Sequence, residues 1–420
     1  MTENIKVFDK IFLSGFLVLL LGFFLNFRIG NTLFPSLTIV YFLLAGIVNY
    51  KNISLQNLKK TSAWIFIVFP LIFAVLEVFN GQFVKDIHFL ERFTAWMIIP
   101  IIIFSYKKWN TWKVTFIQKS FVILNVIFIL LGLGRAFFRL SNYYPKEKKM
   151  NWYYFYRYDF WDFIQQHPVY MSFSILMAFA LVLFQKKLFD TYMRFFIIMI
   201  LFFGIVISGS RTGYLSLFLI IIFYFIYTIN QNGFDIKHLI FGLAGMLALI
   251  LLFQIPIIKE RVYGTLGVKY KYQFYMDNKQ NKTKKTKRET RRFELWKDSW
   301  NVIKQDFFVP RGFNKGLEDI YQQYKQAGHQ YFLNKQYNSH NTFLSIWIYG
   351  GIIWLVNYLL IFFVLIKKSI LSRSPEMAVF ALLFILFSLS ETLFLLRGII
   401  LISFLYSFLL IRFNPNTENR

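Results

Sequence analysis

Three short segments of this sequence carry polar residues whose type and position suit the chemistry of a phosphorylated substrate. The first, SGSRTGY (Ser208 to Tyr214), places Arg211 directly before an apolar run, with Ser208, Ser210 and Thr212 placed to cap a helix start. The dipole and free N–H groups of a helix N-terminus favour an anion, so a cation there is stabilised when an external phosphate binds. The alternative is an arginine that extends to lipid headgroups.

The second segment, RRFELWKDSWNVIKQDF, again combines arginines with a predicted helix start. Its apolar residues recur at three- and four-residue spacing: Phe293, Trp296, Trp300, Ile303 and Phe307. This pattern predicts an amphipathic helix near 289–307 that lies along a membrane surface or covers a cavity. Arg288, Arg291 and Arg292 lie at or just before its start, where an anionic ligand would relieve the charge conflict.

The third segment, NSHNTFLSIWIYGGIIWL, places His340 and Asn341 at the start of an apolar run. The helix dipole disfavours the protonated form of a histidine at this position, so the imidazole is expected to accept a proton near pH 7, as a general base must. The alternative is an interfacial histidine hydrated by water. No two of the five histidines have metal-ligand spacing and cysteine is absent, so we expect neither a metal nor another cofactor.

An all-α, polytopic membrane fold must position these segments. Of the 420 residues, 57% are hydrophobic, 21% aromatic and 16% charged, and the mean hydropathy is +0.48, outside the usual soluble range. Because a bilayer core requires about 20 apolar residues per helix, we predict about twelve transmembrane helices in a single membrane domain, 1–420. The predicted spans are 11–27, 32–49, 62–79, 90–105, 116–134, 168–185, 193–208, 212–230, 238–258, 341–366, 376–390 and 396–412.

The distribution of lysine and arginine predicts the orientation. Positive residues gather in the connections YKNISLQNLKK, YKKWNTWK, QKKLFDTYMR and KKSILSRS, which places these connections and both termini in the cytoplasm. The N-terminal apolar run lacks a small-residue cleavage site, which favours a retained signal anchor. Arg211 and two long loops, 135–167 and 259–340, then face outward. Aromatic residues of the first long loop either stack on sugar rings or lie at the membrane interface.

The net charge of +26 and the basic run NKQNKTKKTKRETRR raise the alternative of a nucleic-acid-binding protein. The predicted orientation excludes that partner, because an outward basic loop meets anionic headgroups or phosphorylated substrates, or serves as a solvated tether. A transporter of lipid-linked sugars is a second alternative. Transporters place ionisable groups near mid-membrane, whereas the predicted span centres here are almost free of charge, which favours an enzyme.

The same segments resemble the O-antigen ligase family, which also includes O-antigen polymerases and some protein O-oligosaccharyltransferases. The resemblance rests on SGSRTGYLSL, on the arginine four residues before tryptophan in RFELW, and on HNTFLSIWIYGG. Weaker matches are LERFTAWMIIPIII, HPVYMSF and SETLFLLRG. The motifs follow one another in the expected order over most of the chain.

The resemblance implies a role for each matching residue. Arg211 and Arg292 would bind the diphosphate of the donor, with Arg291 as the alternative to Arg292, and His340 would be the base. The implied supporting residues of the pocket are Asn341, Arg92, Glu391 and Arg397.

The family also implies the reaction and its place. Its members resemble metal-independent, inverting glycosyltransferases of the bacterial inner membrane with an undecaprenyl-diphosphate-linked glycan as donor and the active site on the periplasmic face. We expect a ligase that acts on a lipid A-core hydroxyl. A polymerase that acts on a glycan, or an enzyme that acts on a protein hydroxyl, stays open.

Overall fold

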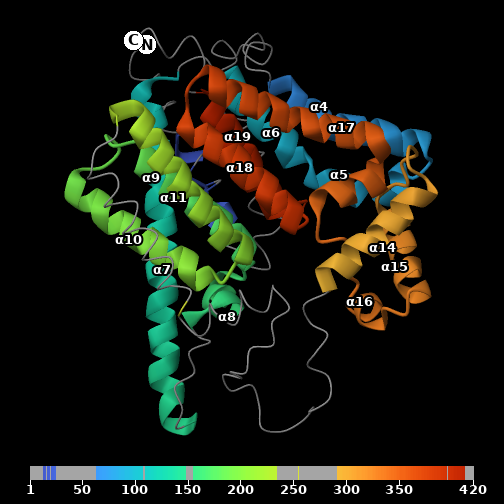
Figure 1. Cartoon of the computed structure of the whole chain (residues 1–420), viewed down its shortest axis with the longest axis horizontal. Helices are drawn as coiled ribbons and strands as arrows, with labels where there is room; N and C mark the ends of the chain where they lie inside the picture. Colours follow the sequence, from blue (N-terminus) through green and yellow to red (C-terminus); the bar gives the residue numbers. More distant parts are fainter. Residues whose placement is uncertain are drawn as a thin grey trace.

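The described part of the chain is helical. In this computed structural model it comprises residues 13–15, 17–18, 20–24, 63–106, 109–147, 155–233, 254, 291–394 and 396–411. These residues form α-helices and one short 3-10 helix, with no β-strand among them, as Figure 1 shows. The predicted all-α class is confirmed. The division into one membrane domain with two outer loops stays a prediction.

Four helices in the described part are long and apolar enough to cross a membrane: Thr111–Asn142, Thr191–Ser208, Arg211–Gln231 and Thr342–Leu371, the last of which is interrupted at Gly351. A fifth span results if the bent pair Phe83–Arg92 and Thr94–Phe104, which meet at 46°, counts as one. The shorter apolar helices are Leu13–Phe24, Ala63–Phe79, Pro168–Phe184, Pro375–Ser390 and Gly398–Ile411. The chain is therefore a membrane protein, whereas the twelve-span arrangement is not confirmed. Predicted span 32–49 lies outside the described residues, as does 238–258 apart from residue 254.

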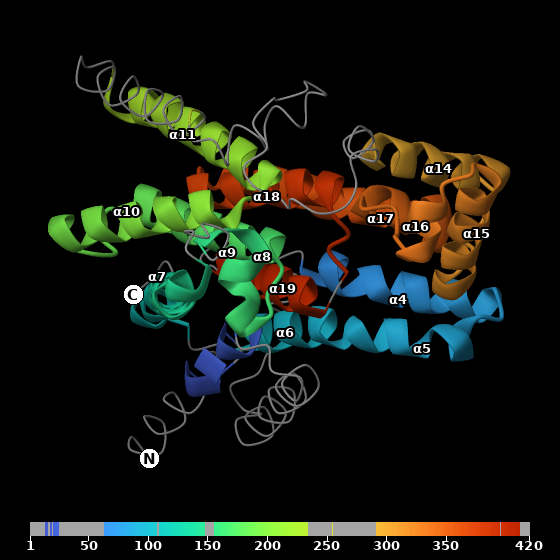
Figure 2. The same cartoon turned by 90° about the horizontal axis from the view of Figure 1, so that it is seen from below.

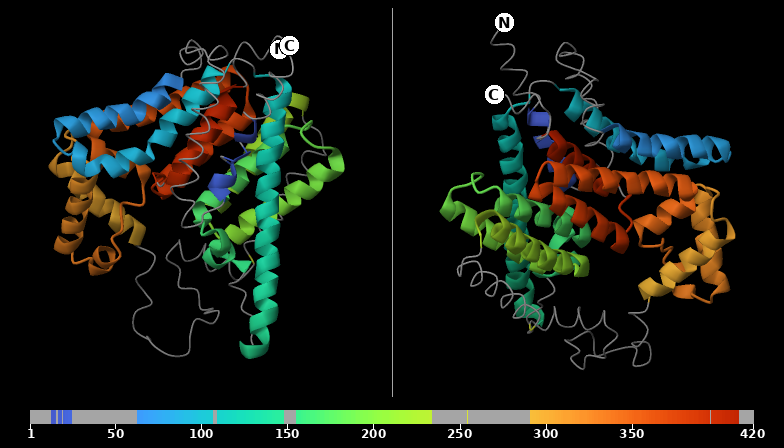
Figure 3. Two further views of the ribbon diagram at one scale, coloured as in Figure 1. Left: turned by 180° about the vertical axis from the view of Figure 1, so that it is seen from behind. Right: turned by 45° about the horizontal axis from the view of Figure 1, so that its top comes forward.

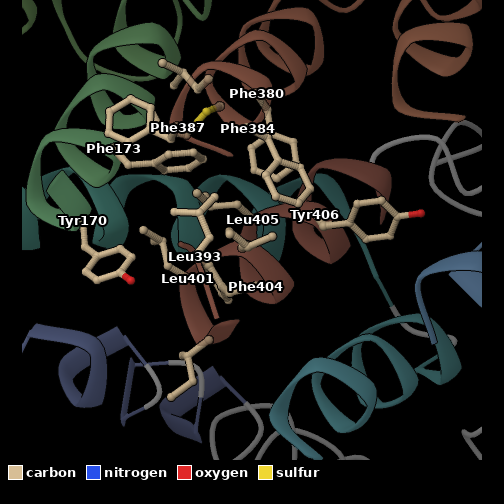
Figure 4. Close-up of a cluster of buried hydrophobic side chains, with 14 of the residues drawn as sticks. Tyr170, Phe173, Phe380, Phe384, Phe387, Leu393, Leu401, Phe404, Leu405 and Tyr406 are labelled. Atoms are coloured by element: carbon tan, nitrogen blue, oxygen red, sulfur yellow. The ribbon is translucent and has the colours of Figure 1, made fainter. Parts of the chain in front are cut away.

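The core forms around helix α9 (Pro168–Phe184), which is buried along almost its whole length. It packs against α7 (Thr111–Glu147), α10 (Thr191–Ser208), α11 (Arg211–Asn232) and α18 (Pro375–Ser390). Figure 4 shows aromatic rings from α9 and α18 meeting the apolar face of α19 (Leu396–Ile411). Close packing of these apolar side chains joins the helices, and a buried hydrogen bond of 2.9 Å from the Ser174 hydroxyl of α9 to the Asn125 side-chain oxygen of α7 adds a polar contact.

Helix α7 is longer than the sequence indicates, as Figure 3 makes plain. The predicted span ends at 134 and gives way to a loop, but the helix continues to Glu147. Arg135 and Arg139, one turn apart on this extension, each contact the carboxylate of Asp162 at 3.2 Å. Asp162 begins a 3-10 turn, η3 (Asp162–Ile164), so the ion pairs fasten the helical extension to the segment that returns to the bundle.

Helix α17 (Thr342–Leu371) corrects the prediction of one continuous span over 341–366. Gly351 has φ 65° and ψ −167° and breaks the helix. The rings of Phe343 and Phe362 lie 5.7 Å apart, whereas 19 residues of straight helix would separate them by about 28 Å. The segment before Gly351 therefore folds back along the segment after it. Glycine suits this position because the left-handed conformation penalises other residues.

A group of three helices follows the long basic segment: α14 (Arg291–Gln305), α15 (Phe313–Gln326) and α16 (Gln330–Asn334). Figure 2 shows these helices at the end of the molecule where α4 (Ala63–Phe79) meets α5 (Phe83–Arg92). Asp86 of α5 accepts hydrogen bonds from the backbone N–H groups of Phe313 and Asn314 at 2.7 and 3.1 Å, which caps α15. The group is thus fastened to the membrane helices.

The buried face of α14 differs from the predicted aromatic stripe. Ile303 is buried, but Phe293 is 69% exposed, and the other buried residues of α14 are Leu295, Asp298, Ser299 and Val302. Trp300 packs edge-on against Trp347 of α17 at 5.4 Å. The aromatic residues therefore extend the contact surface of α14 rather than form its core.

Candidate active site

His340 lies in the loop before α17, and its neighbours fix that loop against a segment distant in sequence. His340 has a positive φ of 46°. The Asn338 side-chain oxygen accepts hydrogen bonds from the His340 backbone N–H at 2.9 Å and from the Thr392 hydroxyl at 3.2 Å. The Thr342 hydroxyl donates to the Glu391 carbonyl oxygen at 2.6 Å. The end of α18 and the start of α17 therefore form one polar junction.

At this junction the His340 imidazole contacts the Glu391 carboxylate, with 2.5 Å between Nδ1 and Oε1. Burial alone would raise the pKa of Glu391, but the hydrogen bond and charge of His340, with nearby His167 and Arg292, lower it below its ordinary value. An ionised carboxylate only accepts hydrogen bonds, so Nδ1 carries the proton. In the neutral form of His340 this tautomer leaves the lone pair on Nε2, the atom that would accept a proton in general-base catalysis.

Arg292 joins the same pair from helix α14. One of its terminal nitrogens lies 3.6 Å from the second carboxylate oxygen of Glu391, and the Arg292 side chain is 45% exposed. A guanidinium with this exposure keeps donors free to bind an anion from outside. Arg291 begins α14, and its side chain lies outside the described residues.

Arg211 is the first residue of α11, as the sequence predicts for a helix start. Ser210 caps this helix, since its hydroxyl accepts a hydrogen bond from the Gly213 N–H at 3.1 Å. Ser208 does not share this role, because its hydroxyl donates to the preceding turn of α10. Arg211 therefore places a guanidinium at the N-terminus of α11, where the backbone N–H groups also favour an anion.

Two further residues belong near this site, although the sequence assigned them no role. The Arg157 side chain packs against Gly209, two residues before Arg211, and a side chain at Gly209 would collide with it. His167 caps α9 by accepting a hydrogen bond from the Val169 N–H at 3.3 Å.

The pKa of His167 reveals its neighbours. Burial lowers this pKa, the Glu391 charge opposes the shift, and the charges of His340, Arg157 and Arg292 lower it further. All four groups therefore lie close enough to interact with His167. The HPVYMSF match was a signal for His167, whereas nothing local to Arg157 distinguishes it from the other basic residues of its loop.

The remaining predicted residues have other contacts. Asn341 is buried and caps α17 by accepting a hydrogen bond from the Leu344 N–H at 3.2 Å. The Arg92 guanidinium lies 5.8 and 5.9 Å from the rings of Phe89 and Phe313. Arg397 is in the first turn of α19, and its side chain lies outside the described residues.

Comparison with known proteins identifies a family match over part of the chain. Residues 195–359 match a family model described as O-antigen ligase. The chain carries an O-antigen ligase family domain. This O-antigen ligase segment includes Arg211, Arg292 and His340 and ends before Glu391. With the apolar helices, it indicates a membrane glycosyltransferase of the ligase or polymerase type. No curated protein matches the chain.

Proposed function

We propose that this protein transfers a glycan from an undecaprenyl-diphosphate carrier to an acceptor hydroxyl, with inversion at the anomeric carbon and without a metal ion. The observation that carries the proposal is the linkage of His340 to Arg292 through the Glu391 carboxylate. It joins a proton acceptor to a cation within one site. A diphosphate leaving group must be stabilised by positive charge, which a guanidinium in the same site can supply.

In this reaction His340 removes the proton from the acceptor hydroxyl. The acceptor oxygen forms a bond to the anomeric carbon while the bond from that carbon to the diphosphate oxygen breaks. The proton passes to Nε2 of His340, and the Glu391 carboxylate stabilises the imidazolium that results. Attack from the face opposite the leaving group inverts the anomeric configuration.

The leaving diphosphate gains negative charge as its bond to the sugar breaks. Guanidinium groups held beside it stabilise the transition state more than the ground state, which lowers the barrier. We assign this role to Arg292 and Arg211, with Arg291 as the alternative to Arg292. Arg157, which packs beside the turn before Arg211, adds positive charge.

The substrates and the location belong to the same proposal. The donor lipid and the outward basic residues favour the periplasmic face of a bacterial inner membrane, with both termini cytoplasmic. The acceptor is a lipid A-core hydroxyl if the protein is a ligase, and a growing glycan or a protein hydroxyl if it is one of the other family types. Membrane lipids are partners of the folded state, and nucleic acid is not.

The test is a transfer assay with purified protein, an undecaprenyl-diphosphate glycan, EDTA and each acceptor class in turn. The wild type should transfer with EDTA present, and His340→Ala, Arg211→Ala and Arg292→Ala should each lose activity while they remain folded. Exposed Lys325→Ala on α15 is the control and should keep full activity. Retained activity in His340→Ala, or dependence on a divalent metal, would refute the mechanism.

A further inference from the structure

A pocket of about 830 Å³ lies at the other end of the bundle from His340. Helix α9 leads from His167, beside the candidate active site, to the pocket residue Phe184, a length of about 25 Å for 17 residues. Helix α11 likewise begins at Arg211 and reaches the pocket at Gln231. The pocket is therefore separate from the site assigned to glycan transfer.

Two amides in the pocket lack partners. Gln118 of α7 is only 4% exposed and forms no side-chain hydrogen bond with any described residue. The buried Nε2 of Gln185, at the end of α9, also has no acceptor within the described part of the chain. Buried amides that face a cavity without partners indicate a ligand that accepts hydrogen bonds.

The charged residues of the pocket favour an anion. Lys186, Lys187 and Arg373 line it, and none of them forms an ion pair with a described residue. Glu376 is the acidic residue among those lining the pocket, and the Ser374 hydroxyl donates to its carboxylate at 2.9 Å. Three cations face one carboxylate that already has a donor, so the pocket carries excess positive charge.

The pocket is also partly apolar, which distinguishes it from a site for a free ion. The rings of Tyr224 and Tyr227 pack on Phe184 at 5.4 and 5.5 Å, and Val114 and Leu183 line the same space. Tyrosines with an apolar body and a polar tip are typical of the boundary between lipid and water.

The sequence segments that supply the cations also indicate which leaflet is involved. Lys186 and Lys187 belong to QKKLFDTYMR and Arg373 to KKSILSRS, two of the connections that the distribution of positive charge assigns to the cytoplasm. Basic pockets between membrane helices on that side suit phosphate headgroups. We propose that this pocket binds the headgroup of an anionic phospholipid from the cytoplasmic leaflet. The proposal shares the orientation, but not the reaction, of the proposed function.

The test is native mass spectrometry of the full-length protein after reconstitution with equal phosphatidylglycerol and phosphatidylcholine. The wild type should retain phosphatidylglycerol preferentially. The triple variant Lys186→Ala/Lys187→Ala/Arg373→Ala should weaken retention of phosphatidylglycerol by about 100-fold, which is the combined effect of three basic residues. Gln118→Leu, which removes the unpartnered amide with little change in volume, should weaken retention by about 10-fold or more, which is what one hydrogen bond to a charged group supplies.

A matched control removes three exposed lysines from helices that do not line the pocket: Lys304→Ala/Lys315→Ala/Lys325→Ala on α14 and α15. This control should retain phosphatidylglycerol as the wild type does. Equal retention of the two lipids, or equal losses in both triple variants, would overturn the proposal. Displacement of the lipid by millimolar inorganic phosphate would also overturn it, because the site would then recognise the free ion. Transfer activity is not measured, so a failure of the proposed reaction leaves this result interpretable.

Discussion

The substitution Glu391→Gln separates the proposed action of Glu391 through His340 from a purely structural role. Glutamine keeps the shape of the side chain and an oxygen that accepts a hydrogen bond from Nδ1, but it removes the negative charge. A hydrogen bond to a charged group contributes about 1.5–3 kcal/mol and a neutral one about 0.5–1.5 kcal/mol. The loss of about 1–2 kcal/mol from the stabilised imidazolium corresponds to a kcat about 5- to 30-fold lower.

The assay is the rate of glycan transfer at saturating donor, with the folded fraction checked by thermal melting. The informative comparison is a double-mutant cycle with His340→Ala. If Glu391 acts through the imidazole, then Glu391→Gln should change the residual rate less than about 3-fold in the His340→Ala background. Exposed Glu318→Gln on α15 is the charge-matched control and should not change kcat.

The same substitution also tests the role of Arg292 in donor binding. Because Arg292 also contacts Glu391, at 3.6 Å, the substitution frees this guanidinium while it weakens the base. KM for the donor should therefore stay constant or fall in Glu391→Gln, whereas Arg292→Ala should raise it. An unchanged kcat in Glu391→Gln, or an equal effect with and without His340, would refute the assignment of Glu391 as the residue that orients the base.

Three further predictions concern the scaffold. Gly351→Ala should lower the melting temperature and the activity, because its φ of 65° costs about 1–2 kcal/mol for alanine and the new carbon would lie 2.7 Å from a backbone oxygen. The control Gly134→Ala, which has open space around the new carbon, should change neither quantity. An unchanged melting temperature in Gly351→Ala would contradict the break in α17. His329→Ala should lower the free energy of unfolding by about 1–3 kcal/mol, because Asp298 loses its 2.6 Å partner. The kcat should stay within about 3-fold of the wild-type value. A larger loss of kcat would mean that this second histidine–carboxylate pair takes part in catalysis. Burial lowers the pKa of His167 from its ordinary 6.5. Below pH 6.5 the unfolded chain therefore binds a proton that the folded chain does not, and the melting temperature should fall as the pH drops. His167→Asn, which keeps the cap, should reduce this dependence of melting temperature on pH, and an unchanged dependence would contradict the burial of His167.

The sequence predicted the parts of the site that depend on local structure. A serine before an apolar run was enough to place the cap of α11 and hence Arg211, and the apolar pattern after His340 was enough to place that residue at a helix start. The all-α class followed from composition. These predictions succeed because capping and hydrophobic periodicity act over a few residues.

The pairing of His340 with Glu391 did not follow from the sequence, because 51 residues separate the two. Their contact depends on the break at Gly351, which returns the first part of α17 to the end of α18. A hydropathy window treats 341–366 as one span, because it measures only apolar character and does not register the backbone conformation of Gly351. Arg157 was missed for a related reason, since it reaches the site by packing on Gly209, a contact between residues 52 apart in sequence.

The exposure of the three linked side chains indicates how substrates must approach them. Exposure falls from 45% at Arg292 to 28% at His340 and 12% at Glu391, so the carboxylate lies deepest. A diphosphate that arrives from outside meets Arg292 first. Arg292 and His340 then lie between the diphosphate and the carboxylate of Glu391. This order avoids the repulsion that an exposed carboxylate would exert on an anionic donor, and it makes the carboxylate a partner of the base rather than of the substrate. A cation at the entrance and an anion behind the imidazole together favour the direction of proton transfer that the proposed reaction requires, from the acceptor hydroxyl to His340.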